Sequence, residues 1–105
     1  MAANRIEILK AMLERNPADT FAAYALAQEF ANSGQLDAAV EQYRQVIASN
    51  ADYAAAYYHG GQAFEKLDRI EEAREMYEKG IEVTRRTGDG HTRSELEAAL
   101  SMLPL

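Results

Sequence analysis

Histidine is the side chain best suited to acid–base chemistry or metal binding in this sequence, and the chain has two, His59 and His91. A metal site needs several ligands that converge, and no cluster of His, Asp or Glu has the spacing for one. The absence of cysteine excludes disulfides, thiol catalysis and cysteine-ligated zinc. No Ser–His–Asp arrangement, phosphate-binding loop or nucleotide fingerprint occurs. We therefore expect no enzyme activity, no cofactor and no metal.

Two pairs of residues offer a different chemistry, which combines hydrogen bonding with aromatic contact. Tyr24 and Gln28 are four residues apart, as are Tyr58 and Gln62, so each pair shares one face of a helix. Tyrosine supplies a rigid ring with a hydroxyl, and glutamine supplies two donors and an acceptor. Such a surface suits a peptide backbone with some apolar side chains. The same pairs are equally compatible with a half-buried packing patch.

Helices must position these residues, because apolar side chains recur at helical spacing along almost the whole chain. Pro17 ends the first helix, since the residue before a proline is pushed out of the helical region. Gly34 and Gly88 can adopt the left-handed conformation that terminates a helix, and Asp68, where Gly34 would recur, tolerates it. Side chains that could cap a helix N-terminus occur at three places: Asn4, Asp52 and Thr92.

The helical pattern predicts a single all-α domain over residues 1–105. No alternating strand pattern of useful length is present, and the short connections predict antiparallel pairs of neighbouring helices. The expected parts are an N-terminal helix, two helical hairpins and a C-terminal helix, over residues 4–16, 20–53, 54–87 and 92–103.

A period of 34 residues relates the two hairpins. The matches under this shift include Leu36 with Ile70, Tyr24 with Tyr58, Gln28 with Gln62, Phe30 with Phe64, Ala39 with Ala73 and Tyr43 with Tyr77. A fixed period of two helices is typical of stacked helical repeats, in which each pair buries its apolar face against a neighbour. The small residues are expected where two helices approach closely, and the aromatic residues between successive pairs.

With these residues the chain resembles the tetratricopeptide repeat (TPR) family, whose repeat has 34 residues. The resemblance covers about residues 5–86, as two full repeats preceded by the second half of another. Four positions depart from the family pattern: Ala23 replaces its usual Trp, Gly60 its Leu, and Ala51 and Arg85 its closing Pro. The last helix falls outside the period.

The resemblance implies a protein-interaction module that binds a peptide or protein segment in a concave groove lined by the first helix of each repeat. The groove positions carried over from the family are Phe21, Tyr24, Ala25, Gln28, Ala31 and Asn32 in the first repeat, and Ala55, Tyr58, His59, Gln62, Glu65 and Lys66 in the second. Some relatives grip a terminal carboxylate with Lys, Asn and Arg. This chain has Tyr24, Gln28 and His59 at the matching places, so that class of ligand is not expected.

Charge and composition further limit the classes of partner that we expect. The formal net charge is −6, and an acidic domain repels a phosphate backbone, so nucleic acid is not an expected partner. No run of signal-peptide or membrane-spanning length occurs. We therefore expect a cytoplasmic protein with a protein or peptide partner. A monomer is the expected state, and a homodimer or larger self-associating scaffold without a peptide ligand is the structural alternative.

Two further surfaces carry expectations of their own. The acidic helix face of Glu71, Glu72, Glu75, Glu78 and Glu82 reads as a solvated outer surface, with Glu75–Lys79 and Glu82–Arg86 as favourable pairs. The C-terminal helix has one apolar side, which is expected to cover the end of the last hairpin around Tyr77, Gly80 and Ile81. The competing hypothesis places this helix in the groove as a displaceable mimic of the partner.

Overall fold

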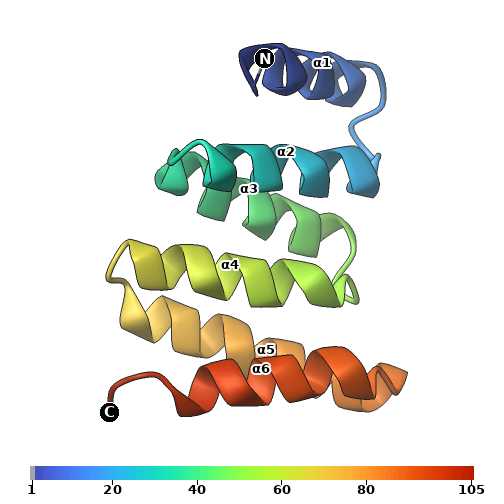
Figure 1. The fold of residues 1–105 in the computed structure, drawn as a ribbon. Helices are drawn as coiled ribbons and strands as arrows, with labels where there is room; N and C mark the ends of the chain where they lie inside the picture. Colours follow the sequence, from blue (N-terminus) through green and yellow to red (C-terminus); the bar gives the residue numbers. More distant parts are fainter. Residues whose placement is uncertain (1) are drawn as a thin grey trace.

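The structure, a computed structural model, describes the backbone of residues 2–105 and the side chains of residues 5–105, and this part of the chain is helical, with no strand (Figure 1). The helices are α1 (Ala2–Arg15), α2 (Thr20–Asn32), α3 (Leu36–Ser49), α4 (Ala54–Lys66), α5 (Ile70–Thr87) and α6 (Gly90–Ser101). The all-α prediction is thus confirmed. No helix in residues 2–105 is long and apolar enough to cross a membrane.

The helices form two layers. The inner layer contains α2, α4 and α6, because α2 contacts α4 and α4 contacts α6 although neither pair is consecutive in the chain. The outer layer contains α1, α3 and α5, whose backbones stay more than 8 Å apart between Cα atoms, although the Arg44 side chain of α3 reaches to 3.8 Å from the Glu72 carboxylate of α5. Because the backbones of the inner helices approach one another more closely than those of the outer helices, the stack of Figure 1 is concave on the inner side.

The hairpin turns recur with the 34-residue period. Gly34 and Asp68 have φ angles of 80° and 59°, so both take the left-handed conformation expected for them. Gly88 ends α5 in the same conformation, with φ 81°. Asp68 is the only non-glycine residue with positive φ in the described part, which fits the tolerance of aspartate for this region.

Most of the small and aromatic residues that recur with the 34-residue period lie in the core. Ala39 and Ala73 are fully buried, and so are the rings of Tyr43 and Tyr77. Phe30 is an exception, because it is only half-buried whereas its counterpart Phe64 is buried. The ring of Phe30 packs against the edge of the core, and the Lys10 ammonium group of α1 lies 5.9 Å from its centroid.

The structure corrects three predictions about helix starts. Helix α1 begins at Ala2, before the cap expected at Asn4. Helix α6 begins at Gly90, and its cap is Asp89, whose carboxylate accepts a hydrogen bond from the Thr92 backbone N–H at 3.1 Å. Asp52 does not cap α4; its carboxylate pairs with Arg86 instead. At α6 the Asp89 carboxylate takes the capping position expected for Thr92. At α4 the Arg86 guanidinium binds the Asp52 carboxylate that was expected to cap the helix.

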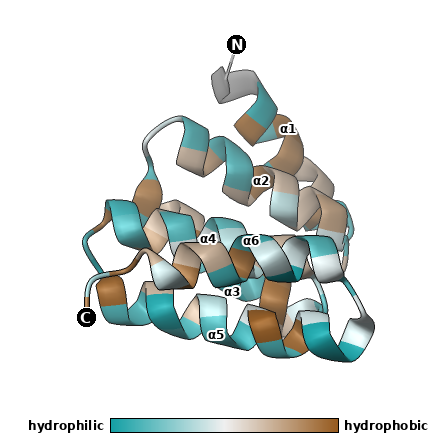
Figure 2. Cartoon of the chain, turned by 60° about the horizontal axis from the view of Figure 1, so that its bottom comes forward, coloured by the Kyte–Doolittle hydropathy of each residue, from teal (hydrophilic) through white to brown (hydrophobic). Residues whose placement is uncertain are grey.

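Helix α6 covers the end of the second repeat, as its apolar side predicted. Leu96 is fully buried and Leu103 nearly so. A Cβ atom added to Gly80 would lie 2.9 Å from the Leu96 side chain, so α6 and α5 meet closely at this point. Figure 2 views this end of the molecule and shows α6 lying across α4 and α5.

Candidate functional site

Three rings form a continuous row across the inner layer, which we call the ring row: Tyr24 on α2, and His59 and Tyr58 on α4. The centroids of Tyr24 and His59 lie 6.1 Å apart, and those of His59 and Tyr58 lie 5.2 Å apart in an edge-on arrangement. All three side chains are half-buried. Each ring is therefore partly covered by the fold and partly accessible to solvent.

Burial shifts the titration of two members of the row. Desolvation, with a smaller contribution from Tyr53, raises the pKa of Tyr24 to about 12. Desolvation also lowers the pKa of His59, against a hydrogen bond with the Gln62 side chain and the charge of Glu95, which both raise it. At neutral pH the rings of Tyr24 and His59 are thus uncharged.

Two of the predicted groove residues have side chains that already form hydrogen bonds within the fold. Gln28 accepts a hydrogen bond from the Tyr43 hydroxyl, and Glu65 accepts one from the Tyr77 hydroxyl. Both tyrosines are buried on the outer layer, so these bonds satisfy hydroxyl groups that have no access to water. Burial and then Glu65 raise the pKa of Tyr77. The equivalence of Gln28 and Gln62 does not extend to this role, because Gln62 is not the partner of Tyr77.

The other predicted groove residues lie beside the row. Phe21 is 70% exposed on the first turn of α2. Asn32 and Lys66 are exposed at the last positions of α2 and α4, and neither takes part in a hydrogen bond or ion pair between described side chains. The structure therefore brings together Tyr24, Tyr58, His59 and Gln62, and leaves Phe21, Asn32 and Lys66 at the margins.

Sequence reasoning missed two residues of this surface. The Tyr53 ring lies 5.0 Å from that of Tyr24 and extends the ring row at its α2 side. Tyr53 stands immediately before α4, outside any helical periodicity, so no pattern could assign it a face. Glu95 comes from α6 and is close enough to His59 to affect its pKa. Its helix falls outside the 34-residue period, and so the period could not place it.

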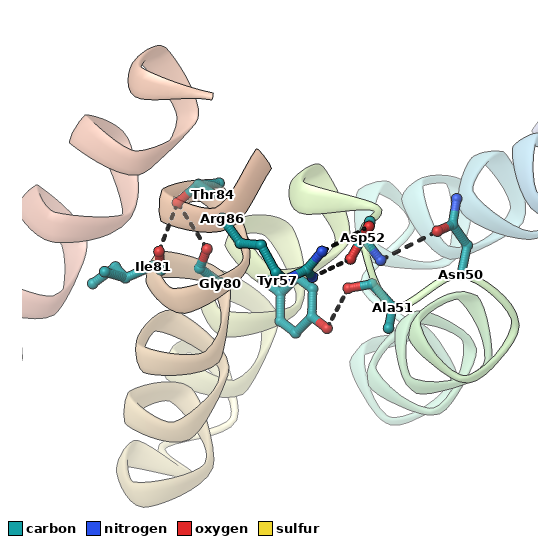
Figure 3. A network of polar contacts seen from close by, with 8 residues as sticks. All are labelled: Asn50, Ala51, Asp52, Tyr57, Gly80, Ile81, Thr84 and Arg86. Carbon is teal, nitrogen blue, oxygen red and sulfur yellow. Dashed lines mark hydrogen bonds and ion pairs between the residues drawn. The ribbon is translucent and has the colours of Figure 1, made fainter. Parts of the chain in front are cut away.

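The outer layer carries ion pairs that join successive helices. Arg86 at the end of α5 pairs with Asp52 in the turn before α4, and not with Glu82 as the helical spacing predicted (Figure 3). No pair between Glu75 and Lys79 forms among the described residues either. The guanidinium groups of Arg44 and Arg69 each lie 5.0 Å from the centroid of the Phe64 ring.

Within the described residues no group of three or more His, Asp or Glu side chains is arranged to hold a metal ion. His91 is exposed on α6, and its nearest acidic neighbour is Glu95 at 3.9 Å. His59 is surrounded by the two tyrosine rings and Gln62. This arrangement can bind a partner by aromatic contact and hydrogen bonding.

Comparisons with known protein families and solved structures support this helical-repeat architecture. A family model described as tetratricopeptide repeat matches residues 24–89. The crystal structure of a tetratricopeptide repeat domain protein from Salinibacter ruber is 38% identical, with a TM-score of 0.73 over 78% of this chain and 91% of that one. No curated protein matches the sequence.

Two further solved structures cover more of the chain. YrrB, a TPR protein described as having an unusual peptide-binding site, is 29% identical with a TM-score of 0.77, over 90% of this chain and 46% of YrrB. SycD, the type III secretion translocator chaperone of Yersinia enterocolitica, has a TM-score of 0.87 over 95% of this chain and 70% of SycD. At 13% identity the likeness to SycD concerns the fold alone.

Proposed function

The chain belongs to the tetratricopeptide repeat family, a fold of protein–protein interaction modules, and from that premise we propose that it binds a polypeptide segment on the concave face of α2, α4 and α6. The observation that carries the proposal is the ring row, which is continuous across two repeats and partly open to solvent. YrrB, which matches over most of this chain, supplies a precedent for peptide binding on the same fold.

The chemistry of the row favours an uncharged, apolar stretch of the partner. Tyr24, Tyr58 and His59 are held by their neighbours, so they lose little conformational freedom on binding. Gln62 adds an amide that can bond to a peptide backbone. The row carries no cation, so a partner would not be recognised through a terminal carboxylate at this place.

The test starts from peptides selected on the full chain out of a random display library. Amide chemical shifts of the ¹⁵N-labelled protein with a selected peptide are expected to change most at Tyr24, Tyr58, His59 and Gln62. Replacing both tyrosines with alanine is expected to weaken binding by about 1–3 kcal/mol per lost anchor, because buried aromatic anchors dominate interface energies.

The matched control replaces Glu41 and Glu75 with alanine. These residues are also 34 positions apart, but they are exposed on the outer layer. The control is expected to bind like the wild type. If the selected peptides change the amide chemical shifts of outer-layer residues, the concave face is not the site. The same holds if the folded Tyr24→Ala/Tyr58→Ala protein binds the peptides as tightly as the wild type.

Self-association is a second candidate function, and one specific observation favours it. Ile8 and Met12 are four residues apart on α1 and are 59% and 37% exposed. The counterpart of Met12 in the first repeat, Val46, is completely buried. This face of α1 is therefore one that a further helix covers when the stack continues, and a second molecule could supply that helix.

Light scattering coupled to size exclusion separates the two candidates. If the apolar face of α1 joins two molecules, the wild type is expected to be dimeric, and the double variant Ile8→Lys/Met12→Lys monomeric. A wild type that stays monomeric at high concentration contradicts self-association and leaves groove binding as the function.

A further inference from the structure

A surface cavity of about 380 Å³ lies on the opposite side of α2 from the ring row, between α1 and α3, and we call it the Ala23 cavity. Its apolar wall consists of Leu13, Pro17, Ala23 and Leu26. Gln42, Gln45 and Ser49 of α3 line the other side. The sequence offers a reason for this space, because Ala23 stands where the second repeat has Tyr57.

The second repeat shows what fills the equivalent space. Tyr57 is buried there, and its hydroxyl donates a hydrogen bond to the Ala51 carbonyl oxygen at 2.7 Å (Figure 3). Its ring forms a wall of two depressions. Shifting four lining residues of the Ala23 cavity by 34 positions gives residues that line those depressions: Leu13 becomes Ile47, Gln42 becomes Met76, Gln45 becomes Lys79 and Ser49 becomes Val83.

The turn that supplies the acceptor has the same form in both places. Asp19 donates its backbone N–H to the Asn16 carbonyl at 3.1 Å, as Tyr53 does to Asn50 at 3.1 Å. The Asn16 and Asn50 side chains each accept from the backbone N–H two residues later, at 3.3 and 3.2 Å. The Pro17 carbonyl therefore occupies the place of the Ala51 carbonyl.

The Pro17 carbonyl also lacks the partner that Ala51 has. No hydrogen bond between described residues ends on the Pro17 oxygen, whereas the Ala51 oxygen accepts from Tyr57. The first repeat thus keeps the acceptor and most wall positions of a tyrosine site, with Leu26 in place of Gly60, but not the tyrosine.

From this we infer that the Ala23 cavity is a binding site for a tyrosine side chain of a partner polypeptide, whose ring takes the place of Tyr57 in the second repeat and whose hydroxyl bonds to the Pro17 carbonyl. Apolar cavities of about 150 Å³ hold benzene, so 380 Å³ accommodates a phenol ring. The site is separate from the concave face and does not depend on it.

The tyrosine has to come from a different polypeptide. All six tyrosines of this chain are buried or half-buried, so a second copy has no exposed tyrosine to insert. The exposed ring of Phe21 has no hydroxyl for the Pro17 carbonyl. Lys10 and Glu14 lie at the cavity with opposite charges, so the recognition rests on the ring and its hydroxyl.

The experiment titrates the ¹⁵N-labelled full chain with p-cresol, the side chain of tyrosine, and with the blocked peptides acetyl-Gly-Tyr-Gly-amide and acetyl-Gly-Phe-Gly-amide. Saturable shifts are expected at the amides of Leu13, Ala23 and Leu26. The tyrosine peptide is expected to bind more tightly than the phenylalanine peptide because only it reaches the Pro17 carbonyl. 4-Methylcyclohexanol, which is not flat, is expected to give no saturable shift.

Two variants test the location. Ala23→Tyr, which copies the second repeat, is expected to fill the cavity and abolish the shifts. Gln45→Trp places a large ring at the cavity from an exposed position and is expected to abolish them without a change in the core. Lys79→Trp is the matched control, one repeat along and equally exposed, and is expected to bind p-cresol like the wild type.

Several outcomes would overturn the inference. Shifts that persist in both folded variants place the p-cresol elsewhere, and equal binding of 4-methylcyclohexanol shows an unselective apolar surface. If the chemical shifts of the Leu13, Ala23 and Leu26 amides change when the protein is diluted without p-cresol, a second copy of the chain occupies the cavity. The Tyr24→Ala/Tyr58→Ala variant keeps the Ala23 cavity. It is therefore expected to bind p-cresol like the wild type even though it loses peptide binding on the concave face.

Discussion

At the scale of single residues, the glycines of α4 and α5 determine how closely neighbouring helices approach. A Cβ atom on Gly61 would overlap the buried ring of Tyr77. A Cβ atom on Gly80 would lie 2.7 Å from the Tyr57 Cβ and 2.9 Å from the Leu96 side chain. The first repeat has Ala27 at the position of Gly61, so the two repeats reach similar packing with different side chains.

We expect Gly61→Ala to destabilise the domain by about 1–3 kcal/mol, the usual cost of overpacking a filled core. The Tyr77 ring cannot move aside, because it is fully buried and its hydroxyl is bonded to Glu65. Urea denaturation measures the effect. Gly90→Ala is the control, since a Cβ atom there meets nothing within 4 Å, and its stability is expected to be unchanged or higher by up to about 1 kcal/mol. Equal stability of Gly61→Ala and the wild type would contradict the packing argument.

His59 makes stability depend on pH. Burial lowers its pKa in the folded state below the ordinary value of 6.5, so the unfolded chain binds a proton more readily. The stabilising effect of keeping His59 neutral is complete above about pH 6.5 and is lost as the pH falls through the lower folded pKa. We expect the melting temperature to fall between pH 7 and pH 5, and the fall to be smaller in His59→Gln.

The control for this measurement is His91→Gln, which removes the other imidazole from an exposed position on α6. It is expected to show the same fall in melting temperature as the wild type. Asp52, Glu72 and Asp89 have lowered carboxyl pKa values, so their contribution is lost in more acidic solution than that of His59. An identical pH profile for His59→Gln and the wild type would exclude His59 as the source.

At the scale of helices, α6 has the position of a further inner-layer helix although its sequence falls outside the repeat period. Leu96 rests against Gly80, and the Arg74 side chain donates to the Pro104 carbonyl oxygen at 2.6 Å. Asp89 caps the start of α6. These contacts place α6 on the end of the second repeat, and they favour a fixed cap over a helix that occupies the concave face as a mimic of the partner.

We expect Leu96→Ala to cost about 2–5 kcal/mol, because Leu96 is fully buried and its loss leaves a cavity between α5 and α6. Met102→Ala is the control, since Met102 is 82% exposed. Deleting residues 90–105 is expected to lower the urea midpoint strongly or to cause association through the uncovered face. A monomeric truncation with an unchanged midpoint and improved peptide binding would support the displaceable helix instead.

At the scale of the whole molecule, the stack has two unequal ends. Helix α6 closes one end by contacts with both α4 and α5, whereas α1 at the other end contacts α2 alone. The molecule measures 38 × 29 × 19 Å, and the helices are stacked along the chain so that each contacts mainly its neighbours. In such stacks stability is close to a sum over repeats and their interfaces.

We therefore expect native-state hydrogen exchange to be fastest in α1 and slowest in α4 and α5, which are packed on both sides. The measurement also bears on self-association, because a dimer formed through the apolar face of α1 would slow exchange in α1 as the protein concentration rises. Equal protection of α1 and α4 in dilute solution would show that the stack unfolds as one unit.

The sequence by itself determined the architecture. Apolar residues at helical spacing, repeated after 34 positions, were enough to predict the hairpins, the left-handed turns at Gly34 and Asp68, and the burial of Tyr43 and Tyr77. These features depend on residues close together in the chain, or on one face of one helix, and local conformational preferences and hydrophobic burial decide them.

Only the tertiary structure decided which groove residues are free and where the chain leaves a space. Gln28 and Gln62 hold equivalent positions, yet Gln28 satisfies a buried hydroxyl and Gln62 lies beside His59. The replacement of an aromatic residue by Ala23 was visible in the sequence, but the resulting cavity depends on α1, α2 and α3 together. Contacts between helices depend on the directions and sizes of side chains from several elements, and a periodic pattern specifies the face of a residue without specifying what meets it there.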